Sequence, residues 1–144
     1  MMKRRPFLLC LAALFTLTVF NLHSAEKGKH KVDLSKIPAA ADKKGVTYAS
    51  DIKTIFDNSC IKCHGPEKPK GKLRLDSIEG ILKGGEDGKV VKPGDGPQSM
   101  LLQNIAHAGD PDDFMPPPKN KANIGPLSAE QIALIRAWID QGAK

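Results

Sequence analysis

Three reactive side chains lie within five consecutive residues of this chain. Cys60 and Cys63 are thiols three positions apart, and His64 follows the second thiol directly. On one turn of chain, two such thiols can each add to one of the two vinyl groups of a haem, and the next histidine is then held under the porphyrin. The stretch Cys60-Ile61-Lys62-Cys63-His64 therefore predicts one covalent haem c, with His64 as the proximal iron ligand.

The same cysteine pair is compatible with three other chemistries. A structural zinc site commonly uses two Cys-x-x-Cys pairs, and the chain has no second pair. His107 could add a ligand, but the adjacent Cys63 and His64 are poorly placed to chelate one metal. A thioredoxin-like redox pair belongs to a βαβ pattern that is absent here, and a simple disulfide remains possible. Haem attachment is the favoured interpretation.

A haem iron bound by His64 has a second axial position, and Met115 is the leading candidate for it. Its thioether is a soft donor that favours ferrous iron. Three prolines follow it at residues 116–118 and would hold it on a rigid extended strap. His107 is the alternative ligand, although the end of a predicted helix is more typical of a residue that stabilises the helix dipole.

Two further residues of the right type are given other roles. Met100 shares helical spacing with Leu101 and Ile105, so we expect it to pack in the core. His30 lies in a lysine-rich stretch far from the haem motif and is a remote third option as a ligand.

Three amphipathic segments are expected to position these side chains. The first starts at Thr47 or Ser50, which are capping residues, and runs to Ser59 directly before the haem motif. The second starts at Pro97 or Gln98 and reaches His107. The third starts with a capping box, Ser128 to Gln131, and Gly142 suits the position after its end.

The long connection at residues 66–97 is rich in Gly, Pro and Lys. Ile78, Ile81 and Leu82 predict one short helical turn in it, and Leu73 and Leu75 carry a weak strand-like alternation. The sequence thus predicts an all-α fold of three to four helices around one covalently bound haem, with a long Gly/Pro-rich loop.

The chain divides into three parts. Residues 1–25 have a basic start, an apolar run of 14 residues at 7–20 and a small-residue end, which is typical of a secretory signal peptide. That run is shorter than the roughly 20 residues of a membrane-spanning helix, so no stable span is expected. Residues 26–44 predict a Lys-rich flexible arm, in which Val32, Leu34 and Ile37 could dock loosely on the domain. Residues 45–144 predict the haem domain.

The charge balance excludes one class of partner. Removal of the signal lowers Lys plus Arg from 22 to 19 against 16 Asp plus Glu, so the net charge falls from +6 to +3. With one Trp and one Tyr there is little stacking surface, and nucleic acid binding is not supported.

The blocks Cys60-Ile-Lys-Cys-His-Gly, Lys72-Leu-Arg-Leu-Asp-Ser, Gly84-Gly, Pro93-Gly-Asp, Met115-Pro-Pro, Leu127-Ser and Trp138-Ile-Asp-Gln-Gly-Ala follow one another in order. This order resembles the planctomycete-type cytochrome c domain, a branch of the class I monohaem c-type cytochromes, over residues 45–143. The resemblance implies haem on Cys60 and Cys63, His64 as proximal and Met115 as distal ligand, and an all-α fold in which the first and last helices cross beside the haem.

The sequence therefore predicts a periplasmic or otherwise extracytoplasmic monohaem cytochrome that carries single electrons and is not an enzyme. Two alternatives are a five-coordinate haem sensor or peroxidase-like protein, and a haem subunit docked on a larger dehydrogenase. A monomer, or a subunit of a redox complex, is expected.

Redox partners with acidic docking surfaces are expected, because six lysines flank the haem motif and the strap: Lys62, Lys68, Lys70, Lys72, Lys119 and Lys121.

Overall fold

The computed structural model describes residues 31–144, and within them the chain is helical and contains no strand. The predicted signal peptide and residues 26–30 of the predicted arm lie outside the described residues. The five α-helices are α1 (Lys53–Ser59), α2 (Ile61–His64), α3 (Ile78–Lys83), α4 (Met100–Ile105) and α5 (Ala129–Asp140). Three 3-10 turns, η1 (Leu34–Lys36), η3 (Lys70–Lys72) and η4 (Pro111–Asp113), and a π-helical turn, η2 (Tyr48–Ile52), complete the elements of this part of the chain.

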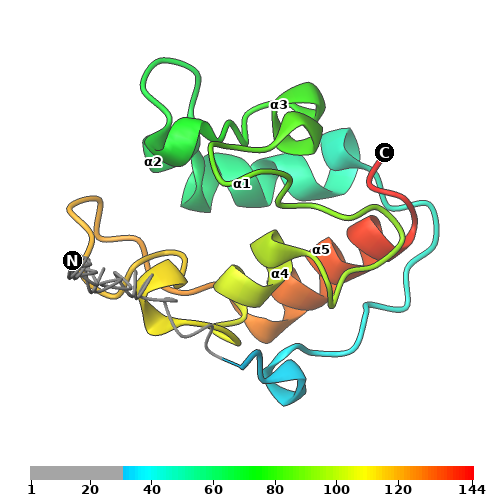
Figure 1. Cartoon of the computed structure of the whole chain (residues 1–144). Coiled ribbons are helices and arrows are strands. Elements are labelled where there is room, and N and C mark those ends of the chain that lie inside the picture. The colour runs from blue at the N-terminus through cyan, green and yellow to red at the C-terminus, as the bar shows by residue number, and fades with distance from the viewer. Residues whose placement is uncertain (1–30) are drawn as a thin grey trace, which may run out of the picture.

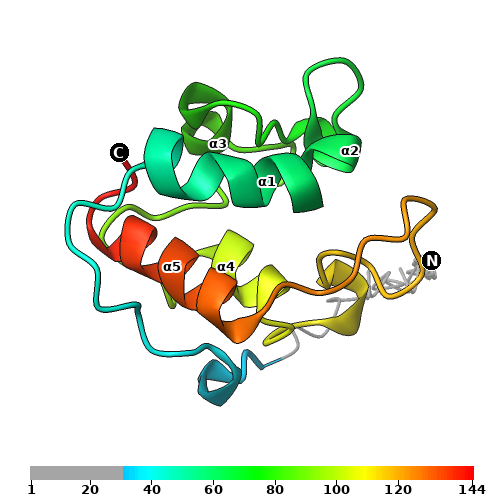
Figure 2. The ribbon, with the colours of Figure 1, turned by 180° about the vertical axis from the view of Figure 1, so that it is seen from behind.

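The all-α class is confirmed for the described residues, but the helices outnumber the three to four that the sequence predicts. The reason is that the haem motif forms a helical turn of its own, α2, and the loop carries the six-residue α3. Helices α1, α2 and α3 lie on one side of the molecule, and α4 and α5 lie on the other (Figures 1 and 2). None of the described helices is long and apolar enough to span a membrane.

The helix that leads into the haem motif is fixed at its start. The hydroxyl of Thr47 accepts a hydrogen bond from the amide of Ser50 at 3.2 Å, so Thr47 is the cap and Ser50 is not. The carboxylate of Asp51 accepts from the amide of Thr47 at 3.0 Å and pairs with the Lys43 ammonium. Cys60 then ends α1 and begins α2, so the motif lies on the turn between two helices.

An aromatic cluster joins the first and last helices. Phe56 of α1, Trp138 of α5 and Tyr48 have ring centroids 6.2 to 6.3 Å apart. Phe56 and Trp138 are 1% and 0% exposed, and the Tyr48 hydroxyl donates to the Leu75 carbonyl at 3.1 Å. Large buried rings contribute much of the stability of a small core, and this cluster holds α1 against α5.

The described part of the predicted arm, residues 31–44, is docked on the helices. Ile37 is buried, and the Arg136 guanidinium of α5 donates to the Pro38 carbonyl at 2.7 Å. The amide of Ala41 donates to the Ala133 carbonyl at 3.0 Å. These contacts place residues 37–41 against α5, and they join residues that are distant in sequence.

Candidate functional site

A mostly apolar cavity lies between the two layers of helices. His64 and Cys60 line it from the haem motif, and Met115 lines it from the proline strap. The remaining wall comes from the long loop and from α4, and comprises Leu73, Leu75, Val90, Leu101, Asn104 and Ile105. The structure thus brings one thiol, one imidazole and one thioether of the predicted site to the same cavity.

The orientation of His64 is fixed by the loop that follows it. Its ring Nδ1 lies 3.2 Å from the Leu73 carbonyl, and the Leu75 amide donates to the His64 carbonyl at 2.9 Å. A carbonyl only accepts, so Nδ1 carries the proton and Nε2 has a free lone pair. Burial lowers the pKa of His64, which favours the neutral imidazole that a metal requires.

The two cysteines present their thiols differently. Burial, and next the neighbouring Cys63, raise the pKa of Cys60 to about 12, so this thiol is protonated at neutral pH. A redox-active Cys-x-x-Cys pair instead contains a thiolate of lowered pKa, which argues against a thioredoxin-like role. Both thiols are free in the structure.

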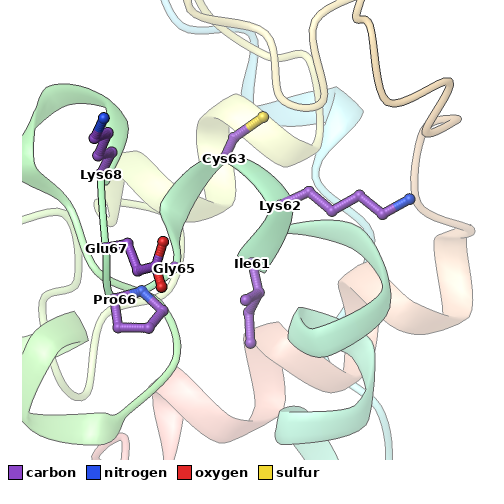
Figure 3. A pocket seen from close by; sticks show the side chains of 7 residues that line it. All are labelled: Ile61, Lys62, Cys63, Gly65, Pro66, Glu67 and Lys68. Atoms are coloured by element: carbon purple, nitrogen blue, oxygen red, sulfur yellow. The ribbon is translucent and has the colours of Figure 1, made fainter.

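Cys63 projects from α2 on the side opposite to Ile61, as Figure 3 shows. It lines a separate shallow pocket with the exposed Lys62 and Lys68 and with Glu67. Of the two cysteines, Cys60 therefore lines the cavity with His64 and Met115, and Cys63 does not. Within residues 31–144 no group of three or more His, Cys, Asp and Glu side chains is placed to hold a metal ion.

Met115 is held at the cavity by its backbone. Its amide donates to the Asn104 carbonyl of α4 at 3.1 Å, and its side chain is half-buried against the core. The peptide bond between Met115 and Pro116 is cis. Asn104 also lines the cavity, so the strap is anchored to a residue of the cavity wall.

His107 does not line the cavity that contains His64 and Met115. Its ring stacks on Phe114, with centroids 4.3 Å apart and planes 2° from parallel. It borders a different pocket, together with the prolines at 116–118. His107 also lies beyond the end of α4, at a backbone φ of +51°, instead of in the last helical turn. The third histidine that the sequence offers, His30, lies outside the described residues.

The expectation that Met100 packs in the core is wrong. Met100 is 40% exposed, because Leu101, Leu102 and Ile105 occupy the buried face of α4. It borders a second cavity that shares His64, Leu73, Val90, Asn104 and Met115 with the first. Met100 thus lies at the open side of the site.

Two pockets border the site, one at Cys63 and one at Met100, and the charged residues around them differ. Exposed lysines 62 and 68 flank the Cys63 side. The Met100 side is bordered by three acidic residues and one lysine: Glu86, Asp87, Asp113 and Lys70. Lys72 lies 3.9 Å from Glu86, an exposed and weak pair.

The chemistry of this donor set suits a covalently bound haem, and of its two thiols Cys60 borders the cavity. The walls are apolar, the motif offers two free thiols, and a neutral imidazole and a thioether border one cavity. Sequence reasoning missed two contributors, the Leu73 carbonyl and the Asn104 carbonyl, because backbone groups leave no signal in side-chain patterns. The weak alternation around Leu73 was the one local sign that this segment is extended.

Comparisons with known proteins give one match. Residues 60–119 match the family model described as Planctomycete cytochrome C. Neither the curated proteins nor the solved structures that were compared gave a match. The matched residues include the haem motif, the loop, α4 and the Met-Pro strap, whereas residues 45–59 and 120–143 of the resemblance lie outside them. Over residues 60–119, this chain is therefore similar to the planctomycete cytochrome C family.

Proposed function

We propose that this protein is an extracytoplasmic monohaem c-type cytochrome that carries single electrons between redox partners. The observation that carries the proposal is that Cys60, His64 and Met115 border one apolar cavity, although Cys60 and Met115 are 55 positions apart in the sequence. Cys60 and Cys63 would hold the haem covalently, His64 would be its proximal ligand and Met115 its distal ligand. The extracytoplasmic location rests on the signal-like residues 1–25.

The chain's own groups each have a defined part in this function. The Leu73 carbonyl keeps His64 in the tautomer whose Nε2 is free to ligate, and a hydrogen-bonded imidazole is a more basic ligand. The strap, held at Asn104, offers the soft thioether of Met115, which favours ferrous iron and a high reduction potential. Leu75, Val90, Leu101 and Ile105 exclude water from the cavity. Bound haem supplies reversible one-electron chemistry at its iron.

The absorption spectrum of the exported protein tests this proposal. We expect a c-type spectrum in the reduced form and, in the oxidised form, the weak near-infrared band of a sulfur–iron bond. A c-type spectrum without that band would contradict methionine ligation. Absence of haem, after expression in a host that matures c-type cytochromes, would contradict the proposal at its first step.

Met115→Ala, compared with Met100→Ala, tests which thioether is the distal ligand. Both variants remove one thioether from the open part of the site, but only Met115 also lines the cavity with Cys60. We expect Met115→Ala to lose the near-infrared band, to lower the reduction potential and to bind cyanide rapidly. Met100→Ala should keep the band. The reverse pattern would move the ligand to Met100.

Rapid cyanide or carbon monoxide binding by the unaltered protein would support the alternative of a five-coordinate sensor or peroxidase-like protein. A stable complex in size-exclusion of native extract would support the haem subunit of a dehydrogenase.

A further inference from the structure

A series of contacts leads from the N-terminal segment to the turn that follows α4. The Lys36 ammonium of η1 donates to the His107 carbonyl at 3.2 Å. The amide of Asp33 donates to the Ala108 carbonyl at 2.7 Å. Figure 1 shows η1, in blue, lying beside this part of the molecule. Residues 33–36 therefore hold the backbone of the turn at 107–108 in place.

His107 has two features that are unfavourable by themselves. Its φ of +51° is in the left-handed region, which residues other than glycine seldom adopt. Its ring atom Nε2 is buried and has no hydrogen-bond partner, and such groups are rare in folded proteins. The surrounding contacts must hold the residue in this state, and the stack on Phe114 is the contact that its ring makes.

The stack lies directly beside the proposed distal ligand. Phe114 immediately precedes Met115, and the amides of His107 and Met115 both donate to the Asn104 carbonyl, at 3.2 and 3.1 Å. The ring pair and this shared carbonyl join the turn to the strap at the end of α4. A displacement of the strap would have to separate the rings or break the bond from Met115 to Asn104.

We propose that the His107–Phe114 stack, supported by Lys36 and Asp33, is a clamp that keeps Met115 at the cavity. His107 is then a positioning residue that acts through Met115 and not an iron ligand. Residues 33–36 become part of the functional site, although their composition predicts a mobile arm. The inference rests on the proposed distal role of Met115, and it predicts that the clamp sets how often the strap opens.

Displacement of the distal ligand by imidazole tests the clamp in the oxidised, exported holoprotein. At saturating imidazole the rate of the spectral change reports strap opening. Loss of an aromatic pair lowers the equilibrium constant for the packed state by about two- to tenfold. His107→Ala should therefore accelerate displacement of the distal ligand by about that factor. His107→Phe keeps a stackable ring without the buried nitrogen, and it should retain a rate close to that of the unaltered protein.

A peripheral variant tests the support from the N-terminal segment. Lys36 is exposed, so Lys36→Ala should fold, and it should accelerate displacement by a smaller factor than His107→Ala. Lys44→Ala is the matched control, because it removes the same charge from an exposed position in the same described segment. Equal acceleration by Lys36→Ala and Lys44→Ala would overturn the proposed support, and unchanged displacement in Lys36→Ala would do the same.

Amide hydrogen exchange at Met115 separates the clamp from the ligand assignment, because its amide bonds to Asn104 whether or not the sulfur binds iron. His107→Ala should accelerate this exchange, and His107→Phe should not. If the unaltered protein lacks the sulfur–iron band but exchange follows this pattern, methionine ligation fails and the clamp on the strap stands. Unchanged exchange and unchanged displacement in His107→Ala would overturn the clamp, as would equal acceleration by His107→Ala and His107→Phe.

Discussion

At the scale of single residues, Asp51 connects the start of the motif-bearing helix to the segment before it. Its carboxylate accepts from the Thr47 amide and pairs with the Lys43 ammonium. The hydrogen bond from Lys43, followed by the Thr47 amide, lowers the pKa of Asp51 below its ordinary range. The folded protein therefore favours the ionised carboxylate more strongly than the unfolded chain does.

The Asp51→Asn variant should show a pH-dependent loss of stability. Because the folded pKa is lowered, the contribution of Asp51 is present above the unfolded pKa of about 4 and is lost as the pH falls through the folded value. We expect urea unfolding to show a lower free energy for Asp51→Asn than for the unaltered protein at pH 6, and a smaller difference near pH 3. Asp42→Asn is the matched control for charge removal, and a similar pattern in it would attribute the effect to net charge.

Residue types predicted part of the site and could not predict the rest. The spacing of Cys60, Cys63 and His64 predicts the haem motif because the side chains themselves carry the chemistry. The exposure of Met100 depends on which face of α4 packs on the core. Leu101, Leu102 and Ile105 occupy that face, and Met100 is left exposed. The position of His107 depends on where α4 ends, which the stack with Phe114 and the bond from Lys36 help to fix.

At the scale of elements, the N-terminal cap of the first helical segment is resolved by the structure. The sequence allows Thr47 or Ser50 as the cap, and only the Thr47 side chain accepts a backbone amide there. Thr47→Ala should lower the free energy of unfolding by about 1 kcal/mol. Ser50→Ala, at an exposed position, should change it by less than about 0.5 kcal/mol. Denaturant unfolding of the two variants checks this, and equal losses would contradict the assignment of the cap.

The elements that sequence predicts well are those whose signals are local. The capping box at Ser128 and Gln131 is present in α5, and Gly142 has a positive φ of +100° just after the helix. The apolar residues of the arm allowed for docking, but its partners could not be predicted because they lie about 70 to 100 positions away: the Lys36 ammonium bonds at a separation of 71 and the Pro38 carbonyl at 98. Helix α3 has six residues and is longer than the single turn expected. The fully buried side chain of Ile81 packs in the core and so stabilises the longer helix.

At the scale of the whole molecule, the lysine-rich side of the site should steer anionic reactants. Oxidation of the reduced holoprotein by ferricyanide should slow as salt is added, since screening removes the attraction. Lys62→Glu should slow this reaction at low salt more than Lys44→Glu, because Lys62 flanks the pocket at Cys63. Stopped-flow rates over a salt series check the prediction. A rate independent of ionic strength would contradict the steering. Faster oxidation by a cationic cobalt complex at low salt would indicate that electrons leave from the acidic Met100 side.

The loop around the paired glycines has a consequence for how related sequences can vary. A side chain at Gly85 would place its Cβ 2.5 Å from the Gly71 carbonyl oxygen and 3.1 Å from the Leu73 Cβ, and one at Gly84 would overlap the Gly88 carbonyl. Leu73 supplies the carbonyl that orients His64. Substitution at Gly85 would therefore disturb His64, the proposed proximal ligand, although the two residues lie 21 positions apart in sequence. Among natural relatives we expect both glycines to be invariant. Amino-acid differences in this loop should be confined to its exposed tip, residues 86–87.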